Sequence, residues 1–345
     1  YKIESYRKDA ATNTLQKVPW KVVGYSTDNG LTWSTSRPTW LTGLTKENGE
    51  GSTNSSGETG TATLQPEALA DRLAQMNAVL KQNPKGSSTN YYDLSMHDIK
   101  GNARATRSTA NCYVISHPGY YKIPLVYGNA ITNGNDNPHA YISQAPTGTP
   151  NEKYVLRHFK DHNNQDITDP WITKSNGGAN APDGAKLVWA DQNGLVTNLS
   201  VSGSGTNAFV NFEVPAAAIK NGNAVIAVTK GGTVVWSWHL WFDHDDALET
   251  IPCTNYQNKI YKFTKQTLGL TYLKWETSSY TKPRVARLKV EQETRNGGVK
   301  QVAYIDITQN PGSDRVATTT FYQFGRKDAF PGTDDILGGT FNKNG

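Results

Sequence analysis

The alternation of side chains between residues 233 and 242 is the feature that most constrains how this chain folds. The segment reads TVVWSWHLWF and follows an apolar run over residues 224–228, across a turn that contains Gly231 and Gly232. Strand side chains point to opposite faces with a period of two, so the second run carries large apolar groups on both of its faces. We predict a β-hairpin that is buried on one face and covered on the other. The structural aromatic residues of this hairpin are Trp236, Trp238 and Trp241.

Composition favours a mainly β protein. Of the 345 residues, 36% are hydrophobic and 19% charged, both below ordinary globular usage, and Thr, Ser, Asn and Gly fill the gap. Short strand patterns separated by Gly, Asn and Pro turns predict β-sandwich or β-barrel domains, and the length suggests two or three of them. The net charge of +5 is spread along the chain. Because nucleic-acid binding needs a concentrated basic face, we expect no nucleic-acid partner.

One segment has the periodicity of an amphipathic helix. Residues 66–83 begin with Pro66 at the first helical position and end at Asn83, before Pro84. An apolar stripe at helical spacing predicts that this helix covers a sheet; its members are Leu69, Leu73, Met76 and Leu80.

Domain boundaries follow from the same patterns. We expect an N-terminal β domain over 1–108 that includes the helix, and a central β-sandwich domain over 109–250. Residues 251–310 form either a small β domain or a continuation of the sandwich, with a hairpin turn at 296–298. Residues 311–345 are a polar tail that opens a truncated C-terminal region.

Candidate chemistry gathers at the end of the Trp-rich strand. Carboxylates next to histidines can bind a metal ion, but this run lacks the alternate Asp positions and the Gly of a calcium loop. We interpret it as a turn-forming cluster at a strand end; its members are His239, Asp243, His244, Asp245 and Asp246. The chain has no nucleophile-elbow, zinc-protease, phosphate-loop or dinucleotide motif. We therefore predict no catalytic, cofactor-binding or metal-binding residues, and a non-enzymatic protein.

Three tryptophans near the N-terminus and two cysteines leave alternatives open. Trp20, Trp33 and Trp40 either fill a small core or present flat faces that stack on sugar rings. Cys112 and Cys253 form either a disulfide in an oxidising compartment or two buried thiols.

Four segments together resemble a known bacterial group. They are VPWKVVGYSTDNGLTWSTSRPTWL, ANCYVISHPGYYKIPLVYGNAI, GNAVIAV followed by VVWSWHLW, and FYQFGRKDAFPG. Between them lies a Leu187–Asp191 and Gly194–Val196 segment that matches the same pattern. With these motifs the chain is similar to the fimbrillin-like or BACON-type surface lipoproteins of gut anaerobic bacteria.

The resemblance implies a cellular location and a broad function. It implies immunoglobulin-like or BACON-like β-sandwich domains at the extracellular face of the outer membrane, attached only through a lipid anchor outside this fragment. The implied function is adhesion or a fimbria-like structural role, with other surface or fimbrial subunits as partners. The alternative is a lectin-like, glycan-binding surface protein whose partner is a host or dietary glycan. Because the sequence starts at Tyr1 and ends soon after the FYQFGRKDAFPG motif, we expect a trimmed fragment.

Overall fold

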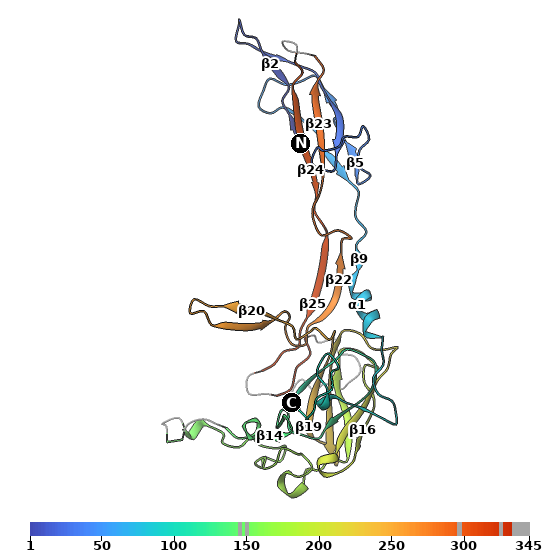
Figure 1. Ribbon diagram of the computed structural model, residues 1–345, viewed down its shortest axis with the longest axis vertical. Helices are drawn as coiled ribbons and strands as arrows, with labels where there is room; N and C mark the ends of the chain where they lie inside the picture. Colours follow the sequence, from blue (N-terminus) through green and yellow to red (C-terminus); the bar gives the residue numbers. More distant parts are fainter. Residues whose placement is uncertain (144–146, 149–151, 295–298, 324–326, 333–345) are drawn as a thin grey trace. The chain divides into compact units, whose positions relative to one another are not determined.

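The computed structural model describes residues 1–143, 147–148, 152–294, 299–323 and 327–332, and it is mainly β (Figure 1). The chain divides into two compact units. Unit 1 consists of Tyr1–Asp71 and Glu276–Asp314, and unit 2 of Arg72–Trp275 and Arg315–Gly345. The chain therefore leaves unit 1, builds most of unit 2, returns to unit 1 at Glu276, and enters unit 2 again at Arg315.

Unit 1 is organised by a sheet whose strands come from both ends of the sequence. Its order is β24-β23-β4-β6. Strand β4 (Trp20–Ser26) pairs antiparallel with β23 (Arg284–Gln292), which pairs in turn with β24 (Val302–Gln309). The smaller elements of the unit are β1 (Lys2–Ile3) with β7 (Glu58–Thr59), β2 (Tyr6–Lys8) with β3 (Leu15–Lys17), β5 (Leu41–Leu44) with β8 (Ala62–Leu64), β6 (Asn48–Gly49), and β9 (Ala70–Asp71).

This pairing corrects the predicted domain boundaries. Residues 276–310 belong with residues 1–71, whereas 72–108 and 251–275 belong with unit 2. The reason is apolar burial: Leu288 and Ala286 of β23 are buried in one cluster with Tyr25 of β4. Neither segment can cover its apolar face without the other, and contiguity in sequence does not reveal that dependence. The predicted turn at 296–298 lies outside the described residues.

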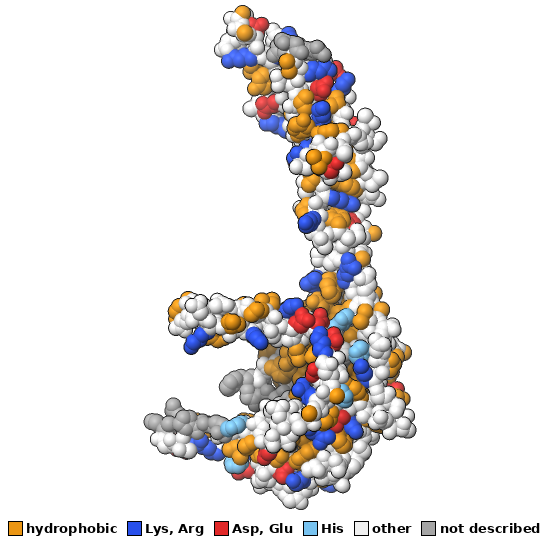
Figure 2. Space-filling view, in the orientation of Figure 1, with side chains coloured by type: hydrophobic (Ala, Val, Ile, Leu, Met, Phe, Trp, Pro, Cys, Tyr) orange, Lys and Arg blue, Asp and Glu red, His pale blue; other side chains and the backbone are white. Residues whose placement is uncertain are grey.

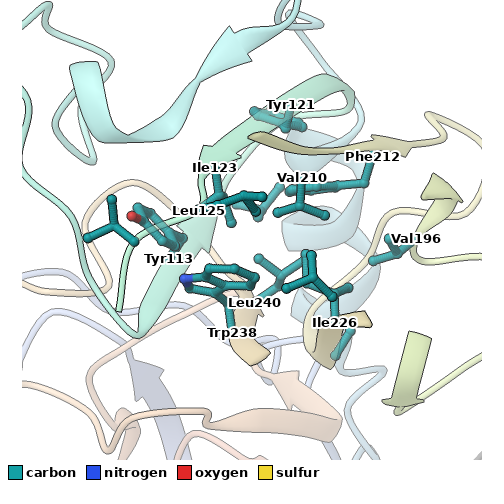
Figure 3. Close-up of a cluster of buried hydrophobic side chains, with 14 of the residues drawn as sticks. Tyr113, Tyr121, Ile123, Leu125, Val196, Val210, Phe212, Ile226, Trp238 and Leu240 are labelled. Carbon is teal, nitrogen blue, oxygen red and sulfur yellow. The ribbon is translucent and has the colours of Figure 1, made fainter. Parts of the chain in front are cut away.

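Unit 2 contains two four-stranded sheets that contribute to one core. The first has the order β10-β12-β17-β16 and the second β11-β19-β18-β15. Figure 3 shows side chains of both meeting, with Ile123 and Phe212 from the first sheet and Trp238 and Leu240 from the second. The strands are β10 (Tyr92–Asp93), β11 (Cys112–Ile115), β12 (Gly119–Pro124), β15 (Gly184–Ala190), β16 (Thr197–Ser202), β17 (Phe209–Val214), β18 (Gly222–Lys230) and β19 (Thr233–Phe242).

Strands β18 and β19 form the hairpin that the alternating pattern predicts. They pair antiparallel from Gly222 with Phe242 to Lys230 with Thr233. Trp238 belongs to the core and is buried, as is Trp241 on the opposite face. Trp236 is half-buried, and its ring meets that of Tyr127 edge-on at 4.9 Å. Trp238 and Trp241 are therefore packing residues, whereas Trp236 is only partly covered.

The helix is shorter than predicted. Helix α1 spans Arg72–Leu80, and residues 70–71 form β9, which pairs with the end of β22 (Thr271–Thr277). The expected start at Pro66 is wrong because the residues before the helix make tertiary contacts: the Glu67 carboxylate accepts a hydrogen bond of 2.5 Å from Ser278. Within the helix, Met76 and Leu80 are the buried members of the predicted stripe.

The remaining elements are short. They are β13 (Ile131–Thr132), β14 (Asn135–Asp136), β20 (Thr250–Thr254), β21 (Ile260–Thr264), β25 (Ser313–Thr318), and 3-10 turns at Leu94–Met96, Pro138–Ala140, Glu152–Tyr154, Ser175–Gly178 and Gly205–Asn207. Among the described residues, no helix has the length and apolar character that crossing a bilayer requires.

Candidate functional site

The three tryptophans proposed as a sugar-stacking platform do not share an exposed surface. Trp20 is 1% exposed and Trp40 is 7% exposed. The indole nitrogen of Trp20 donates a hydrogen bond of 2.6 Å to Glu58, which fixes the ring inside unit 1. Both residues therefore belong to the core, and their assignment as stacking aromatics is corrected. Trp33 alone of the three is exposed, at 39%.

Trp33 lies on the outer face of the unit 1 sheet, next to an aromatic residue from the other end of the chain. Its ring stacks with that of Tyr304 at 5.7 Å, and the Lys289 ammonium lies 5.8 Å from its centre. A β-carbon added to Gly24 would stand 3.3 Å from the Trp33 ring, so the glycine allows the ring to lie close to the sheet. Tyr304 was missed because the sequence separates it from Trp33 by most of the chain.

A two-stranded hairpin of unit 2 has an apolar face in contact with solvent. Strands β20 and β21 pair with each other, and all ten of their residues are exposed. Alternation gathers one set of side chains on a single side of this hairpin, hereafter its apolar face: Ile251, Cys253, Tyr261 and Phe263. The opposite side carries three threonines and Lys262, together with Pro252 and Ile260. In Figure 1 the hairpin stands clear of the two sheets of unit 2, and Figure 2 shows apolar side chains along it.

A polar row crosses the outward side of the second sheet of unit 2. Cys112 of β11 and His239 of β19 are partners in the parallel pairing, with the thiol sulfur 3.3 Å from Nδ1 of His239. Nε2 of His239 lies 2.9 Å from Oδ1 of Asn223 on β18. The Asn223 amide nitrogen donates in turn to the Asp191 carboxylate at 3.0 Å.

A thiol, an imidazole and an amide in this order resemble the Cys-His-Asn triad of enzymes that use a cysteine nucleophile. Here, however, burial opposes nucleophilic chemistry. It raises the pKa of the Cys112 thiol to about 12 and lowers the pKa of the His239 imidazole to about 4. Both shifts favour the neutral thiol and the neutral imidazole, whereas a nucleophile needs the thiolate. We therefore assign the row to structure.

The C-terminal segment of the described chain covers this row. The hydroxyl of Tyr322 lies 2.6 Å from Nδ1 of His239. The indole nitrogen of Trp189 donates to the carbonyl oxygen of Ala329 at 3.1 Å, and Ser237 donates to the Asp328 carboxylate at 2.5 Å. The FYQFGRKDAFPG motif thus includes residues that dock onto the hairpin of β18 and β19; residues 324–326 of it lie outside the described residues.

The predicted turn cluster after β19 does not converge on a metal ion. Nε2 of His244 lies 3.3 Å from the carbonyl oxygen of Met76, while Asp245 forms an ion pair of 3.6 Å with Lys100. His239 is held by Tyr322 on the sheet face. Within the described residues, no group of three or more His, Cys, Asp or Glu side chains is placed to hold a metal.

Three members of that cluster, Asp243, His244 and Asp246, instead line a cavity of about 420 Å³ in unit 2. Asp243 is 2% exposed, and burial raises the pKa of its carboxyl group to about 6. The rings of Tyr272 and Trp275 stack at 4.9 Å in the cavity wall, and Met76 of α1 also lines the cavity, next to His244. The sequence singled out Asp243 and His244 for another chemistry, and it gave no signal for Tyr272 or Trp275.

The two cysteines are separate free thiols: Cys112 lies within the polar row, and Cys253 is exposed on the β20–β21 hairpin. Comparison of the chain with protein-family models, with curated proteins and with solved structures gives no match.

Proposed function

We propose that this protein is a non-enzymatic bacterial cell-surface protein that acts in adhesion or as a fimbria-like structural component. Its partners are other surface or fimbrial subunits, and it is held at the outer membrane through a lipid anchor outside this sequence. We also propose that its units are β-sandwich domains of the immunoglobulin-like or BACON-like kind. The sequence motifs that resemble surface lipoproteins support this placement.

The exposed apolar face of the β20–β21 hairpin is the observation that carries the proposal. Ile251 and Phe263 are cross-strand partners, 50% and 59% exposed. An isolated two-stranded hairpin is only marginally stable in water, and contiguous exposed apolar side chains mark interaction sites. A neighbouring subunit that covers this face gains the burial of these side chains, at about 25 cal/mol per Å² of apolar surface.

Charge placed on either side of the hairpin tests the proposal. The double variant Ile251→Lys with Phe263→Lys puts two ammonium groups on the apolar face. The matched control, Thr250→Lys with Thr264→Lys, makes the same charge change at a cross-strand pair on the opposite side. We expect the wild type and the control to self-associate or to bind a neighbouring surface subunit in sedimentation experiments, and the first variant to do neither. Equal behaviour of the two variants, or a wild type that binds nothing, contradicts the proposal.

Glycan binding is the second candidate function, and the Trp33–Tyr304 pair favours it. Two exposed stacked rings beside a lysine provide both the flat apolar face and the polar neighbours that a sugar ring requires. On a glycan array, Trp33→Ala and Tyr304→Ala should each abolish binding. Tyr6→Ala is the control, because this exposed tyrosine also lies in unit 1 but on another strand pair. If the wild type binds no glycan, this candidate function is excluded.

A further inference from the structure

The cavity beside helix α1 holds a buried acid without a counter-ion. The Asp243 carboxylate accepts hydrogen bonds from the backbone N–H of His244 at 2.7 Å and from the Gln266 amide at 2.8 Å. Among the described residues, neither Asp243 nor Asp246, which also lines the cavity, forms an ion pair with a lysine or arginine. An ionised carboxylate has about four acceptor sites, so Asp243 keeps capacity for a further donor.

The two basic residues in the cavity wall have other partners. Lys265 forms an ion pair of 2.6 Å with Glu249, and the Arg72 guanidinium donates to Gln75 at 2.9 Å. Among the described residues, neither forms an ion pair with Asp243. Moving a carboxylate out of water is costly unless a cation or several donors compensate it, and two hydrogen bonds are a small compensation. The site therefore favours a ligand that carries positive charge to Asp243.

The rest of the wall is suited to an apolar stem. Met76 and Val79 of α1 line the cavity, as do the stacked rings of Tyr272 and Trp275. A purely apolar ligand would leave the buried Asp243 carboxylate without a further donor, and an anion would place a second negative charge beside it. A ligand with an ammonium group on an aliphatic chain would place its charge at the Asp243 carboxylate and its chain against the apolar wall.

We propose that this cavity binds a primary ammonium group carried on an aliphatic stem, with the nitrogen at Asp243 and the stem between α1 and the Tyr272–Trp275 rings. Both a lysine side chain of a partner protein and a free alkylamine have this chemistry. The volume of about 420 Å³ falls within the ordinary range for small-ligand sites, of roughly 300–1,000 Å³. The site is independent of the β20–β21 apolar face, so either proposal can fail alone.

Titration calorimetry on the full chain tests the proposal with three probes. N-acetyl-lysine N-methylamide carries the ammonium group, its norleucine analogue has a neutral aliphatic side chain, and hexylamine is a free amine. We expect at least tenfold tighter binding of the lysine probe than of the norleucine probe. Hexylamine binding tighter than the lysine probe assigns the site to free amines, and the reverse order assigns it to lysine side chains. Equal binding of the lysine and norleucine probes, or no binding of either amine at millimolar concentration, overturns the proposal.

A pair of variants locates the site. Asp243→Asn keeps the shape of the side chain and should weaken binding of both amines at least tenfold. Asp245→Asn removes the same charge two residues away, from a carboxylate paired with Lys100, and should leave binding unchanged. Equal effects of the two substitutions overturn the assignment to Asp243. Near-ultraviolet circular dichroism checks the fold of each variant. The comparison of the three probes uses the wild type, so it remains valid even if a variant does not fold.

Acidification should weaken amine binding as Asp243 takes up a proton, around pH 6. The charged groups that face this carboxyl across the cavity are His244 and Asp246 in its own loop, Arg72 on α1, and Lys265 before β22. Replacing His244 tests whether the neighbouring imidazole contributes to the pH dependence. His244→Gln therefore separates the two groups: the pH dependence should persist in this variant and disappear in Asp243→Asn.

Discussion

The hydroxyl oxygen of Tyr322 lies 2.6 Å from Nδ1 of His239, which precedes it by 83 residues. His239 stands in the middle of the polar row on strand β19, and Tyr322 belongs to the segment that covers the row. The tyrosine completes the hydrogen bonding of an imidazole that is 4% exposed. The closing segment is thus joined to the sheet by a specific polar contact as well as by apolar packing.

Replacing Tyr322 with Phe removes this contact and keeps the ring. His239 then retains only the Cys112 sulfur, 3.3 Å from Nδ1, as a weak partner on that side. Because a buried polar atom that loses its partner costs about 1–3 kcal/mol, the free energy of unfolding should fall by about that amount in urea titrations. Tyr256→Phe, at a position 92% exposed, should change it by less than about 0.5 kcal/mol. Similar values for the two variants would show that the contact adds nothing to stability.

Replacing Trp238 with Ala should destabilise the protein far more. The side chain is 1% exposed and lies in the core between the two sheets of unit 2. Truncating a buried tryptophan leaves a cavity and costs about 3–5 kcal/mol. The denaturation midpoint measures the effect, and Leu31→Ala at an 85% exposed position is the control. A change of only a few tenths of a kcal/mol for Trp238→Ala would contradict the packing role.

The stability of Asp243→Asn relative to the wild type should depend on pH. Burial raises the pKa of the Asp243 carboxyl from 3.8 to about 6 in the folded state. Between these values the unfolded state has lost the proton that the folded state keeps, so the contribution of Asp243 to the free energy of unfolding falls as pH rises, and the loss is complete above about pH 6. Asn does not titrate, and the variant should therefore gain about 2 kcal/mol on the wild type between pH 4 and pH 7.

The pH dependence of the wild type alone does not isolate Asp243, because the pKa of His239 is also shifted and its effect has the opposite sign. Its lowered pKa, about 4, means that the unfolded state binds a proton at mildly acidic pH while the folded state does not. Its contribution to stability is present above about pH 6.5 and is lost as pH falls towards 4, which opposes the Asp243 effect in the wild-type profile. Chemical denaturation at several pH values, with Asp245→Asn as the control, isolates Asp243. A difference between Asp243→Asn and wild type that is constant with pH contradicts the prediction.

The two thiols should react at very different rates. Cys253 is exposed, whereas the Cys112 thiol is held in the polar row with its pKa raised to about 12. Because the thiolate is the reactive form, Ellman's reagent should modify one thiol per chain quickly and the second only after unfolding. Cys253→Ser should abolish the fast phase and Cys112→Ser the slow one. Fewer than two reactive thiols in the denatured, unreduced protein would instead indicate a disulfide.

The candidate sites were predictable only in part. The sequence drew attention to Asp243 and His244 because charged residues follow an apolar strand, but it suggested a metal or a turn rather than a cavity wall. Met76, which meets His244 in the structure, is 168 residues away in the chain. Trp20 and Trp33 are both tryptophans in strand-like surroundings, and only the packing of Glu58 and Gly24 around them separates a core residue from an exposed one.

The sequence by itself determined the mainly β character and the hairpin of β18 and β19, because alternation and turn residues act over a few neighbouring positions. Only the tertiary structure decided which distant segments pair: β4 joins β23 across more than 250 residues, the start of the predicted helix becomes β9, and Tyr322 closes the row at His239. The physical reason is that strand pairing and side-chain burial depend on surfaces from anywhere in the chain, whereas local conformational preference depends only on the nearest residues.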